Sequence, residues 1–339
     1  DGNGYKLPDE VEDQLEEYVR QSADNELPRP TGDGIGKIEH NSNLAHFYAH
    51  FVRHTIDTSL EGMTIVYDGA NGAASSVGPE ILAGLGAKVI NINVNPDGLN
   101  INHHCGSTHI EGLQVAVQQH NADLGIANDG DADRCLLVDE KGQVLDGDQI
   151  MLLCALKLKE EGKLKGDTVV GTVMSNIGFH KAAQELGMKT FATAVGDRYV
   201  LEYMREHNLS VGGEQSGHVI FLDYNTTGDG MLTAVQVAAL MKEKNQPLSE
   251  LAGIMTKYPQ VLINVRVATK TGWEDNDIIK AAIVTAEGEL GDEGRVLVRA
   301  SGTEPLIRVM AEGPNQEELQ ALCQEIADII GREQGLAEK

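Results

Sequence analysis

The densest group of reactive side chains in this sequence is the segment 129–134, which reads D-G-D-A-D-R. Three carboxylates held this close repel one another unless a cation neutralises them. Hard divalent cations prefer such oxygen ligands, and magnesium is held by a few carboxylates together with phosphate oxygens. An arginine beside such a cluster indicates that an anion, most simply a phosphate, binds there as well. The segment is therefore a candidate divalent-cation site.

Two other interpretations of this segment compete with the first. One is a solvated acidic turn, and the other is a calcium-binding EF-hand loop of the pattern D-x-[DN]-x-[DN]-G-x5-E. Glu140 does stand at the twelfth position counted from Asp129. The sixth position, however, is Arg134 where the sharp turn of that loop needs glycine, and the flanking residues are typical of strands. These two departures disfavour the EF-hand.

A glycine-bearing turn at 212–218, G-G-E-Q-S-G-H, forms a second group. Its glycines allow the backbone and a ligand to approach each other closely. Glu214 and Ser216 can bind neighbouring sugar hydroxyls, and His218 can move a proton or contact a phosphate. A purely structural turn explains the same residues equally well.

The segment 299–308, R-A-S-G-T-E-P-L-I-R, forms a third group. Its hydroxyls and free backbone amides lie between two arginines, which together suit a phosphate. The alternative is a surface hairpin with incidental arginines, but clustered positive charge in so acidic a chain favours the anion site. The residues concerned are Arg299, Ser301, Gly302, Thr303 and Arg308.

Two further segments carry weaker signals. Asp197 and Arg198 stand at the expected start of a helix, where Asp197 can simply cap it. Arg198 opposes the helix dipole at that position, which indicates that it serves a ligand. The segment 68–72, D-G-A-N-G, follows a strand but does not match G-x-G-x-x-G, and we interpret it as structural.

The composition excludes several classes of function. The 339 residues carry a formal net charge of −25, which argues against nonspecific binding of nucleic acid or anionic membranes. No apolar run approaches the roughly 18 residues that cross a bilayer. The four cysteines form no CxxC pair, and the histidines around Cys105 match no zinc spacing. Dispersed cysteines of this kind suit a reducing cytosol.

The elements that position these groups follow from the hydrophobic pattern. Strands alternate with helices in two successive units, which predicts α/β domains with mixed or mainly parallel sheets, and the last 80 or so residues predict a small α+β domain with an antiparallel sheet. We expect helices at 8–21, 44–56, 77–85, 113–120, 149–161, 178–186, 197–206, 231–242 and 316–330, and strands at 63–67, 88–92, 122–127, 135–138, 168–172, 189–192, 209–211, 261–268, 295–299 and 306–310.

Taken together, the segments D-G-D-A-D-R, G-G-E-Q-S-G-H and R-A-S-G-T-E-P-L-I-R resemble the loops of the α-D-phosphohexomutase superfamily, in the superfamily's order. The glutamine at position 215 resembles the residue of the phosphoglucosamine mutase branch, whereas phosphomannomutase/phosphoglucomutase enzymes typically have methionine at this position. The resemblance implies a remnant of a first domain and linker at 1–40, α/β domains at 41–147 and 148–257, and an α+β domain at 258–339.

The resemblance also implies an activity and a set of ligands. It implies conversion of glucosamine 6-phosphate to glucosamine 1-phosphate through a bisphosphate intermediate, in the cytoplasm, on the route to UDP-N-acetylglucosamine and cell-wall precursors. Mg²⁺ is the implied cofactor, and a homodimer is left open. By position, the resemblance implies that Mg²⁺ would be bound by Asp129, Asp131 and Asp133 and that the phosphoryl group would contact Arg134. The sugar would be bound by Glu214, Ser216 and His218. The phosphate that does not react would be bound by Arg299, Ser301, Gly302, Thr303 and Arg308, and Asp197 and Arg198 are further candidates.

One expected part has no counterpart in these residues. The superfamily's nucleophile is a phosphorylated serine in a T-A-S-H-N-P-like segment, and no Ser-His-Asn-Pro occurs in the 339 residues. The segment 1–7 is similar to the stretch just after that region, so we expect most of the first domain to be missing. We therefore expect this chain to bind metal and sugar phosphate weakly and to lack turnover. A phosphomannomutase/phosphoglucomutase and a noncatalytic sugar-phosphate-binding module remain the alternatives.

Overall fold

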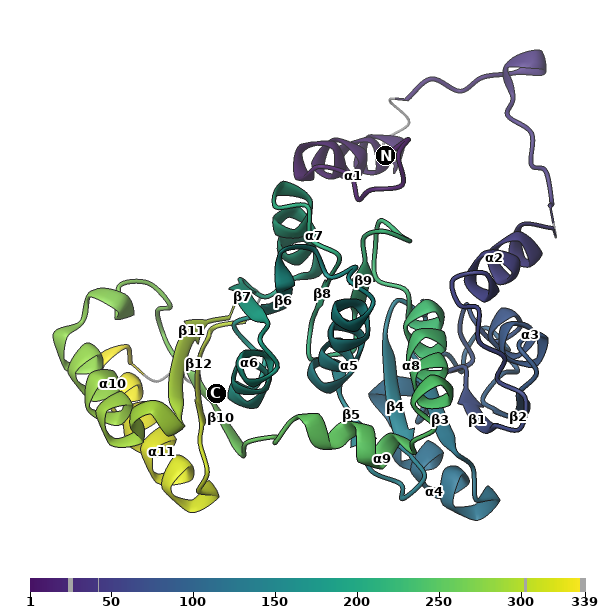
Figure 1. Ribbon diagram of the computed structural model, residues 1–339. Coiled ribbons are helices and arrows are strands. Elements are labelled where there is room, and N and C mark those ends of the chain that lie inside the picture. The colour runs from purple at the N-terminus through teal and green to yellow at the C-terminus, as the bar shows by residue number, and fades with distance from the viewer. Residues whose placement is uncertain (24–26, 42, 302–303, 336–339) are drawn as a thin grey trace. The chain divides into compact units, whose positions relative to one another are not determined.

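The computed structural model describes residues 1–23, 27–41, 43–301 and 304–335 (Figure 1). The chain divides into two compact units. The first comprises Asp1–Met174 and Thr190–Gly253, and the second comprises Ser175–Lys189 and Ile254–Lys339. Within the described ranges, no helix is both long enough and apolar enough to cross a bilayer.

The first unit contains a five-stranded mixed sheet in the order β2-β1-β3-β4-β5. Strands β2, β1 and β3 are parallel, whereas β4 and β5 are antiparallel to their neighbours. Buried aliphatic side chains of helix α4, including Leu113 and Val117, pack against Val66 and Val138 of the sheet. The bounds are β1 Thr64–Asp68, β2 Lys88–Ile92, β3 Leu124–Asn128, β4 Cys135–Asp139, β5 Val144–Leu145, α2 Asn43–Arg53, α3 Val77–Gly84 and α4 Glu111–His120.

A four-stranded sheet in the order β7-β6-β8-β9 follows. Strand β6 is parallel to β8, and β8 and β9 form an antiparallel hairpin. Helix α8 is buried along Gly230–Met241 and contacts helix α5 as well as strands β3 and β4 of the first sheet. The bounds are α5 Gly147–Glu160, β6 Thr168–Thr172, β7 Lys189–Thr193, α7 Asp197–Glu206, β8 Val211–Gly213, β9 Val219–Phe221, α8 Gly230–Lys244 and α9 Leu248–Leu251.

The strand expected at 209–211 instead occupies Val211–Gly213, inside the expected glycine turn. Glycine is a poor strand former, so local propensity argues against this placement. Close packing decides it: a Cβ on Gly212 would lie 2.9 Å from Cβ of Val170, and one on Gly213 would lie 2.2 Å from the carbonyl oxygen of His218. These glycines let β8 pair closely with both of its neighbours.

The second unit is built on a three-stranded antiparallel sheet in the order β10-β12-β11. Helices α10 and α11 bury Ile279 and Ile326 against Ile307 and Val309 of strand β12. Helix α10 is absent from the sequence-based expectation; its β-branched residues favour strand locally, and Asn276 caps its first turn. The bounds are α6 Ile177–Glu185, β10 Gln260–Arg266, α10 Asp277–Leu290, β11 Arg295–Ala300, β12 Leu306–Glu312 and α11 Gln316–Glu333.

The N-terminal segment of the first unit forms helix α1, Asp9–Ala23, close to the expected 8–21. Its first turn carries three acidic residues, which suits the positive end of the helix dipole. Short 3₁₀ turns complete the fold at Gly32–Gly34, Gly106–Thr108, Lys165–Asp167, Ala252–Ile254, Trp273–Asp275 and Gly291–Glu293.

Candidate active site

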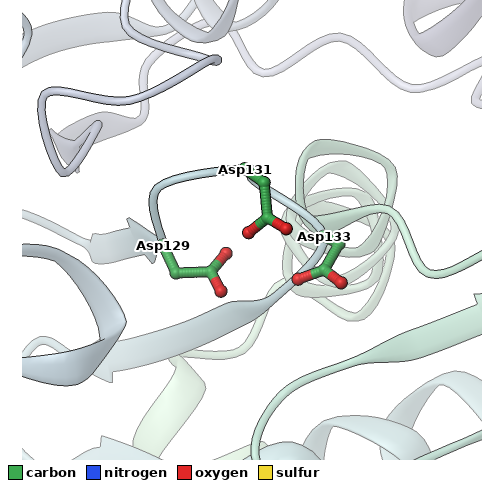
Figure 2. A group of neighbouring side chains, drawn as sticks. All are labelled: Asp129, Asp131 and Asp133. Carbon is green, nitrogen blue, oxygen red and sulfur yellow. The ribbon is translucent and has the colours of Figure 1, made fainter. Parts of the chain in front are cut away.

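The acidic segment forms a tight loop between two antiparallel strands. Strand β3 ends at Asn128 and β4 begins at Cys135, so both expected flanking strands are present. Asp129, Asp131 and Asp133 each offer an oxygen, and these three oxygens lie within 4.8 Å of one another. Figure 2 shows the three carboxylates converging from the loop toward a common point. This geometry suits a single cation held by hard oxygen ligands.

Neutral hydrogen bonds fix the base of this loop. The Asn128 amide donates to the carbonyl of Arg134 at 2.8 Å, and the buried Tyr67 hydroxyl donates to the Asn128 side-chain oxygen at 3.0 Å. The D-G-A-N-G turn supports the loop from one side: Ala73 N–H donates to the Gly130 carbonyl at 2.8 Å, and a Cβ on Gly72 would lie 2.2 Å from that oxygen. The loop is therefore positioned before any ligand binds.

The acidic loop carries an excess of negative charge that a bound cation would neutralise. Burial, followed by the charges of Asp133 and Asp131, raises the pKa of Asp129 to about 6. Arg134 Nε lies 3.7 Å from an oxygen of Asp129 and 3.9 Å from Oδ1 of Asp133, too far for a hydrogen bond to either. Oδ1 of Asp133 is buried and has no hydrogen-bond partner in the described part of the chain. The donor set therefore fits a divalent cation.

The turn 214–218 connects β8 to β9 and is joined to the acidic loop by backbone hydrogen bonds. Cys135 N–H donates to the Gly217 carbonyl at 3.0 Å. Ser216 is exposed, whereas Glu214 is half-buried and accepts from Gly196 N–H at 3.1 Å. Thus the structure brings the second group of sequence-predicted residues beside the first.

His218 lies deeper than the other two residues expected to contact sugar. It is 2% exposed. Its Nδ1 lies 3.0 Å from Oδ2 of Asp133, and its Nε2 accepts from Gly228 N–H at 3.2 Å. Both ring nitrogens therefore have partners within the protein. The hydrogen bond to His218 is also the main reason why the pKa of Asp133 is lowered.

The segment 196–198 begins helix α7, with Gly196 rather than Asp197 at the N-cap position. Asp197 instead forms an ion pair with Lys6, and one of its oxygens lies 3.5 Å from Nε2 of His218. Arg198 donates to the carbonyl of Leu7 at 2.8 Å, so it fastens the N-terminal segment. Sequence reasoning missed Lys6, because a lone lysine in an irregular segment carries no local signal of its distant partner.

The third group lies in the second unit, where β11 and β12 place Arg299 and Arg308 as cross-strand partners. Burial, and then the charge of Arg308, lowers the pKa of Arg299. Nε of Arg308 is buried and has no hydrogen-bond partner among the described residues. Arg308 also pairs with Glu304 at 3.4 Å, so its Nε is the group that lacks a partner among the described residues. Two adjacent arginines of this kind make the turn a candidate anion site.

The turn between these strands provides a hydroxyl. Ser301 is buried, and its Oγ accepts from Glu304 N–H at 3.2 Å. Lys270, which the sequence analysis did not single out, donates to the Ser301 carbonyl at 2.7 Å and adds a third cation. The expected phosphate-binding residues Gly302 and Thr303 lie outside the described residues.

Comparison with protein families identifies three consecutive domain models along the chain. Residues 45–142 match phosphoglucomutase/phosphomannomutase alpha/beta/alpha domain II, residues 146–258 match alpha/beta/alpha domain III, and residues 262–329 match the C-terminal domain. Together the three matches extend over most of the chain.

Curated relatives are similar over almost the whole chain. A phosphoglucosamine mutase of Symbiobacterium thermophilum is 54% identical over 334 residues, which cover 98% of this chain and 74% of the relative. Phosphoglucosamine mutases of Geobacillus kaustophilus and Bacillus subtilis are 51% and 49% identical, with 98% and 99% of this chain and 74% and 75% of the relative covered. The chain thus spans about three quarters of these relatives.

Solved structures share the fold. A phosphoglucomutase/phosphomannomutase family protein of Burkholderia thailandensis superposes with a TM-score of 0.76 at 22% identity, covering 96% of this chain and 71% of that one. An N-acetylphosphoglucosamine mutase of Aspergillus fumigatus, in complex with GlcNAc-6P and magnesium, gives a TM-score of 0.68 at 23% identity, covering 83% and 68%. The expected fold class is thereby confirmed.

Proposed function

We infer the function of this chain from the phosphoglucomutase/phosphomannomutase family, to which it belongs. Its activity is that of a phosphohexomutase, an isomerase, because its curated relatives are phosphoglucosamine mutases. The reaction we propose converts glucosamine 6-phosphate to glucosamine 1-phosphate through a bisphosphate intermediate. The observation that carries this proposal is the acidic triad joined to the turn 214–218 within one compact unit.

The acidic loop is the proposed site of phosphoryl transfer. Asp129, Asp131 and Asp133 hold Mg²⁺, which when bound neutralises charge on the transferring phosphoryl oxygens. Arg134 contacts the same phosphoryl group, since its side chain is 43% exposed and hydrogen-bonds to neither carboxylate. The unpartnered oxygen of Asp133 supports a ligand set that is complete only with a cation.

The remaining residues bind and orient the substrate. Exposed Ser216 and half-buried Glu214 hold hydroxyl groups of the sugar. Arg299, Arg308 and Ser301, with Gly302 and Thr303, grip the phosphate that does not react. Gripping this phosphate in either substrate orientation lets one site serve both transfer steps, because positioning supplies most of the catalysis in phosphoryl transfer.

The nucleophile of the proposed reaction is a phosphoserine, and its Ser-His-Asn-Pro context does not occur in the 339 residues. The serine gives its phosphoryl group to the free hydroxyl of the substrate and takes the other phosphate back from the bisphosphate. All four cysteines are free and buried, which supports placing the reaction in the reducing cytoplasm.

Calorimetric titration of the 339-residue chain with sugar phosphates, in the presence of Mg²⁺, tests this proposal. We expect glucosamine 6-phosphate to bind about tenfold or more tightly than mannose 6-phosphate. Equal affinities would contradict the amino-sugar specificity, and no binding of either would contradict the site. We also expect no mutase turnover; turnover by pure chain would show that the reaction does not need that serine.

A further inference from the structure

We propose that Asp197 is a specificity-determining residue that binds the ammonium group at carbon 2 of an amino-sugar phosphate, and that Lys6 occupies the same place while no substrate is bound. This inference rests on the proposed function, because it concerns how the proposed site distinguishes an amino sugar from a sugar with a hydroxyl at carbon 2. The alternative is a structural ion pair that fastens the N-terminal segment to helix α7.

The carboxylate of Asp197 faces the turn 214–218, in which the proposed sugar-binding residues lie. Its Oδ2 is 3.5 Å from Nε2 of His218. The preceding residue, Gly196, donates its N–H to Oε1 of Glu214 at 3.1 Å. The side chains of Asp197 and Glu214 therefore meet at the start of α7. A sugar hydroxyl needs only one acceptor, so a second carboxylate at this place suits a ligand group that carries positive charge.

A primary ammonium already binds this carboxylate. Arg198 N–H donates to Oδ1 of Asp197 at 2.9 Å, and the Lys6 ammonium pairs with Oδ2. The side chains of Lys6 and Asp197 are 43% and 23% exposed. An ion pair this exposed contributes little to stability, so another ammonium can readily take the place of Lys6. The amine of an amino sugar is such a group, because it is mostly protonated at neutral pH.

The Lys6 ammonium also lies near the acidic loop. The pKa of Asp133 is lowered chiefly by its hydrogen bond with His218, and the positive charge of Lys6 contributes to the same shift. A sugar whose ammonium replaced that of Lys6 would therefore lie beside both the turn 214–218 and the proposed cation site.

The N-terminal segment has other attachments that do not involve this ion pair. Arg198 donates to the carbonyl of Leu7 at 2.8 Å, and the guanidinium of Arg205 lies 3.9 Å from the centre of the Tyr5 ring. These contacts are on both sides of Lys6 in the sequence. The backbone of the segment can therefore stay in place when the Lys6 side chain moves away from its partner.

Exchange of one ammonium for another provides the selectivity. A substrate ammonium that displaces Lys6 restores the ion pair of Asp197 and adds the remaining contacts of the sugar. A hydroxyl at carbon 2 has no charge with which to replace Lys6, so the second sugar gains nothing from this carboxylate. A site built to bind a charged donor discriminates strongly against the analogue that lacks it.

Calorimetric titration of the 339-residue chain and its variants, at saturating Mg²⁺, compares glucosamine 6-phosphate with glucose 6-phosphate. These two ligands differ only at carbon 2. The variants are Asp197→Asn, which removes the charge, and Lys6→Gln, which removes the internal ammonium. Asp167→Asn is the control, because it makes the same charge change in an exposed ion pair, 2.7 Å from Lys159. Thermal melts establish that each variant is folded.

We expect the unsubstituted chain and Asp167→Asn to prefer glucosamine 6-phosphate by roughly tenfold. Asp197→Asn should bind glucosamine 6-phosphate roughly 10- to 100-fold more weakly and glucose 6-phosphate within about threefold of the original affinity. Lys6→Gln should raise the preference for the amino sugar about threefold, because no internal ammonium occupies the place. Asp197→Ser replaces Asp197→Asn if that chain does not fold, with the same loss expected.

Three results would overturn the inference. A folded Asp197→Asn that keeps the original preference, or that loses both sugars equally, would leave Asp197 without a role in selectivity. A preference that Lys6→Gln leaves unchanged would exclude the exchange of one ammonium for the other. The unsubstituted chain tests the proposed function separately: if it binds neither sugar, the proposed site fails, whereas contradictory results in the variants alone refute only the role of Asp197 and Lys6.

Discussion

Arg299 and Arg308 lie directly opposite each other on β11 and β12. Like charges in this relation destabilise an antiparallel pair by some tenths of a kcal/mol up to about 1 kcal/mol. Burial and the neighbouring charge already lower the pKa of Arg299. A phosphate bound there, as proposed, would relieve the repulsion and supply acceptors for both guanidinium groups. The proposal therefore predicts a small instability of the free protein that a bound phosphate would remove.

Replacing Arg308 by glutamine should affect the stability of the ligand-free chain and the binding of ligand differently. Arg308→Gln should leave the ligand-free chain as stable as the original, or more stable by up to about 1 kcal/mol, because the repulsion is gone and the lost pair with Glu304 is a weak, partly exposed one. It should abolish most of the rise in melting temperature caused by glucosamine 6-phosphate. Arg332→Gln, an equal charge change at an exposed position of α11, is the control and should keep that rise. A full rise in Arg308→Gln would exclude a phosphate-binding role.

Gly217 is required by both conformation and space. Its φ is 96°, and a Cβ there would lie 2.4 Å from the Cys135 carbonyl oxygen. Gly98 has a similar φ of 88° but nothing within 4 Å of its Cβ position. Gly98→Ala should cost about 1 kcal/mol from strain alone, and Gly217→Ala about 2–4 kcal/mol because the clash is added. Urea unfolding measures the loss of stability in both variants. Equal losses would mean that the contact of Gly217 with the Cys135 carbonyl adds no clash.

The carboxylate of Glu312 is fully buried in the second unit and accepts from Arg295 Nε at 2.8 Å and from Gln260 Nε2 at 2.8 Å. Glu312→Gln should destabilise this unit by about 3–5 kcal/mol, because it leaves the charge of Arg295 without its buried partner. The exposed pair between Asp275 and Lys280, 3.9 Å apart, provides the control. Asp275→Asn should change the unfolding free energy by less than about 1 kcal/mol.

The lowered pKa of His180 predicts that the second unit loses stability as the pH falls. Burial, and then the charge of Arg295, lowers its pKa from 6.5 to about 4. As pH falls below 6.5, the unfolded chain takes up a proton that the folded chain refuses, so stability is lost progressively down to about pH 4. The loss is at most about 3 kcal/mol.

Denaturant unfolding of the chain and of His180→Gln between pH 7 and pH 4 isolates this contribution. Other groups titrate in both proteins, so only the difference between the two curves reports on His180. The difference should shift in favour of His180→Gln as pH falls. A difference that stays constant with pH would show that His180 titrates normally.

Local sequence patterns were sufficient for the elements that carry the acidic loop. Apolar runs on each side of residues 129–134 predicted the two strands, and β2 and β6 have the expected bounds. The pattern failed where packing overrides propensity, as at Gly212 in β8, and where β-branched residues stand in a helix, as in α10.

The sequence predicted the motifs of the candidate site but not the contacts between their residues. Residue types and spacing pointed to the three aspartates and to Arg299 and Arg308 as candidates. The hydrogen bond between His218 and Asp133 joins residues 85 positions apart, and the pair of Lys6 with Asp197 joins residues 191 apart. Such contacts depend on how whole sheets and helices pack, which no short pattern contains.

Helix α8 also limits how the chain can be divided. It follows the second sheet in the sequence, yet it is buried along twelve residues, Gly230–Met241, and contacts β3 and β4 of the first sheet. A fragment ending near residue 145 would expose the apolar strand faces that α8 covers, and such surfaces aggregate. We therefore expect the segment 45–142 to need helix α8 for a covered sheet face, although the family models at 45–142 and 146–258 assign that helix to the second segment.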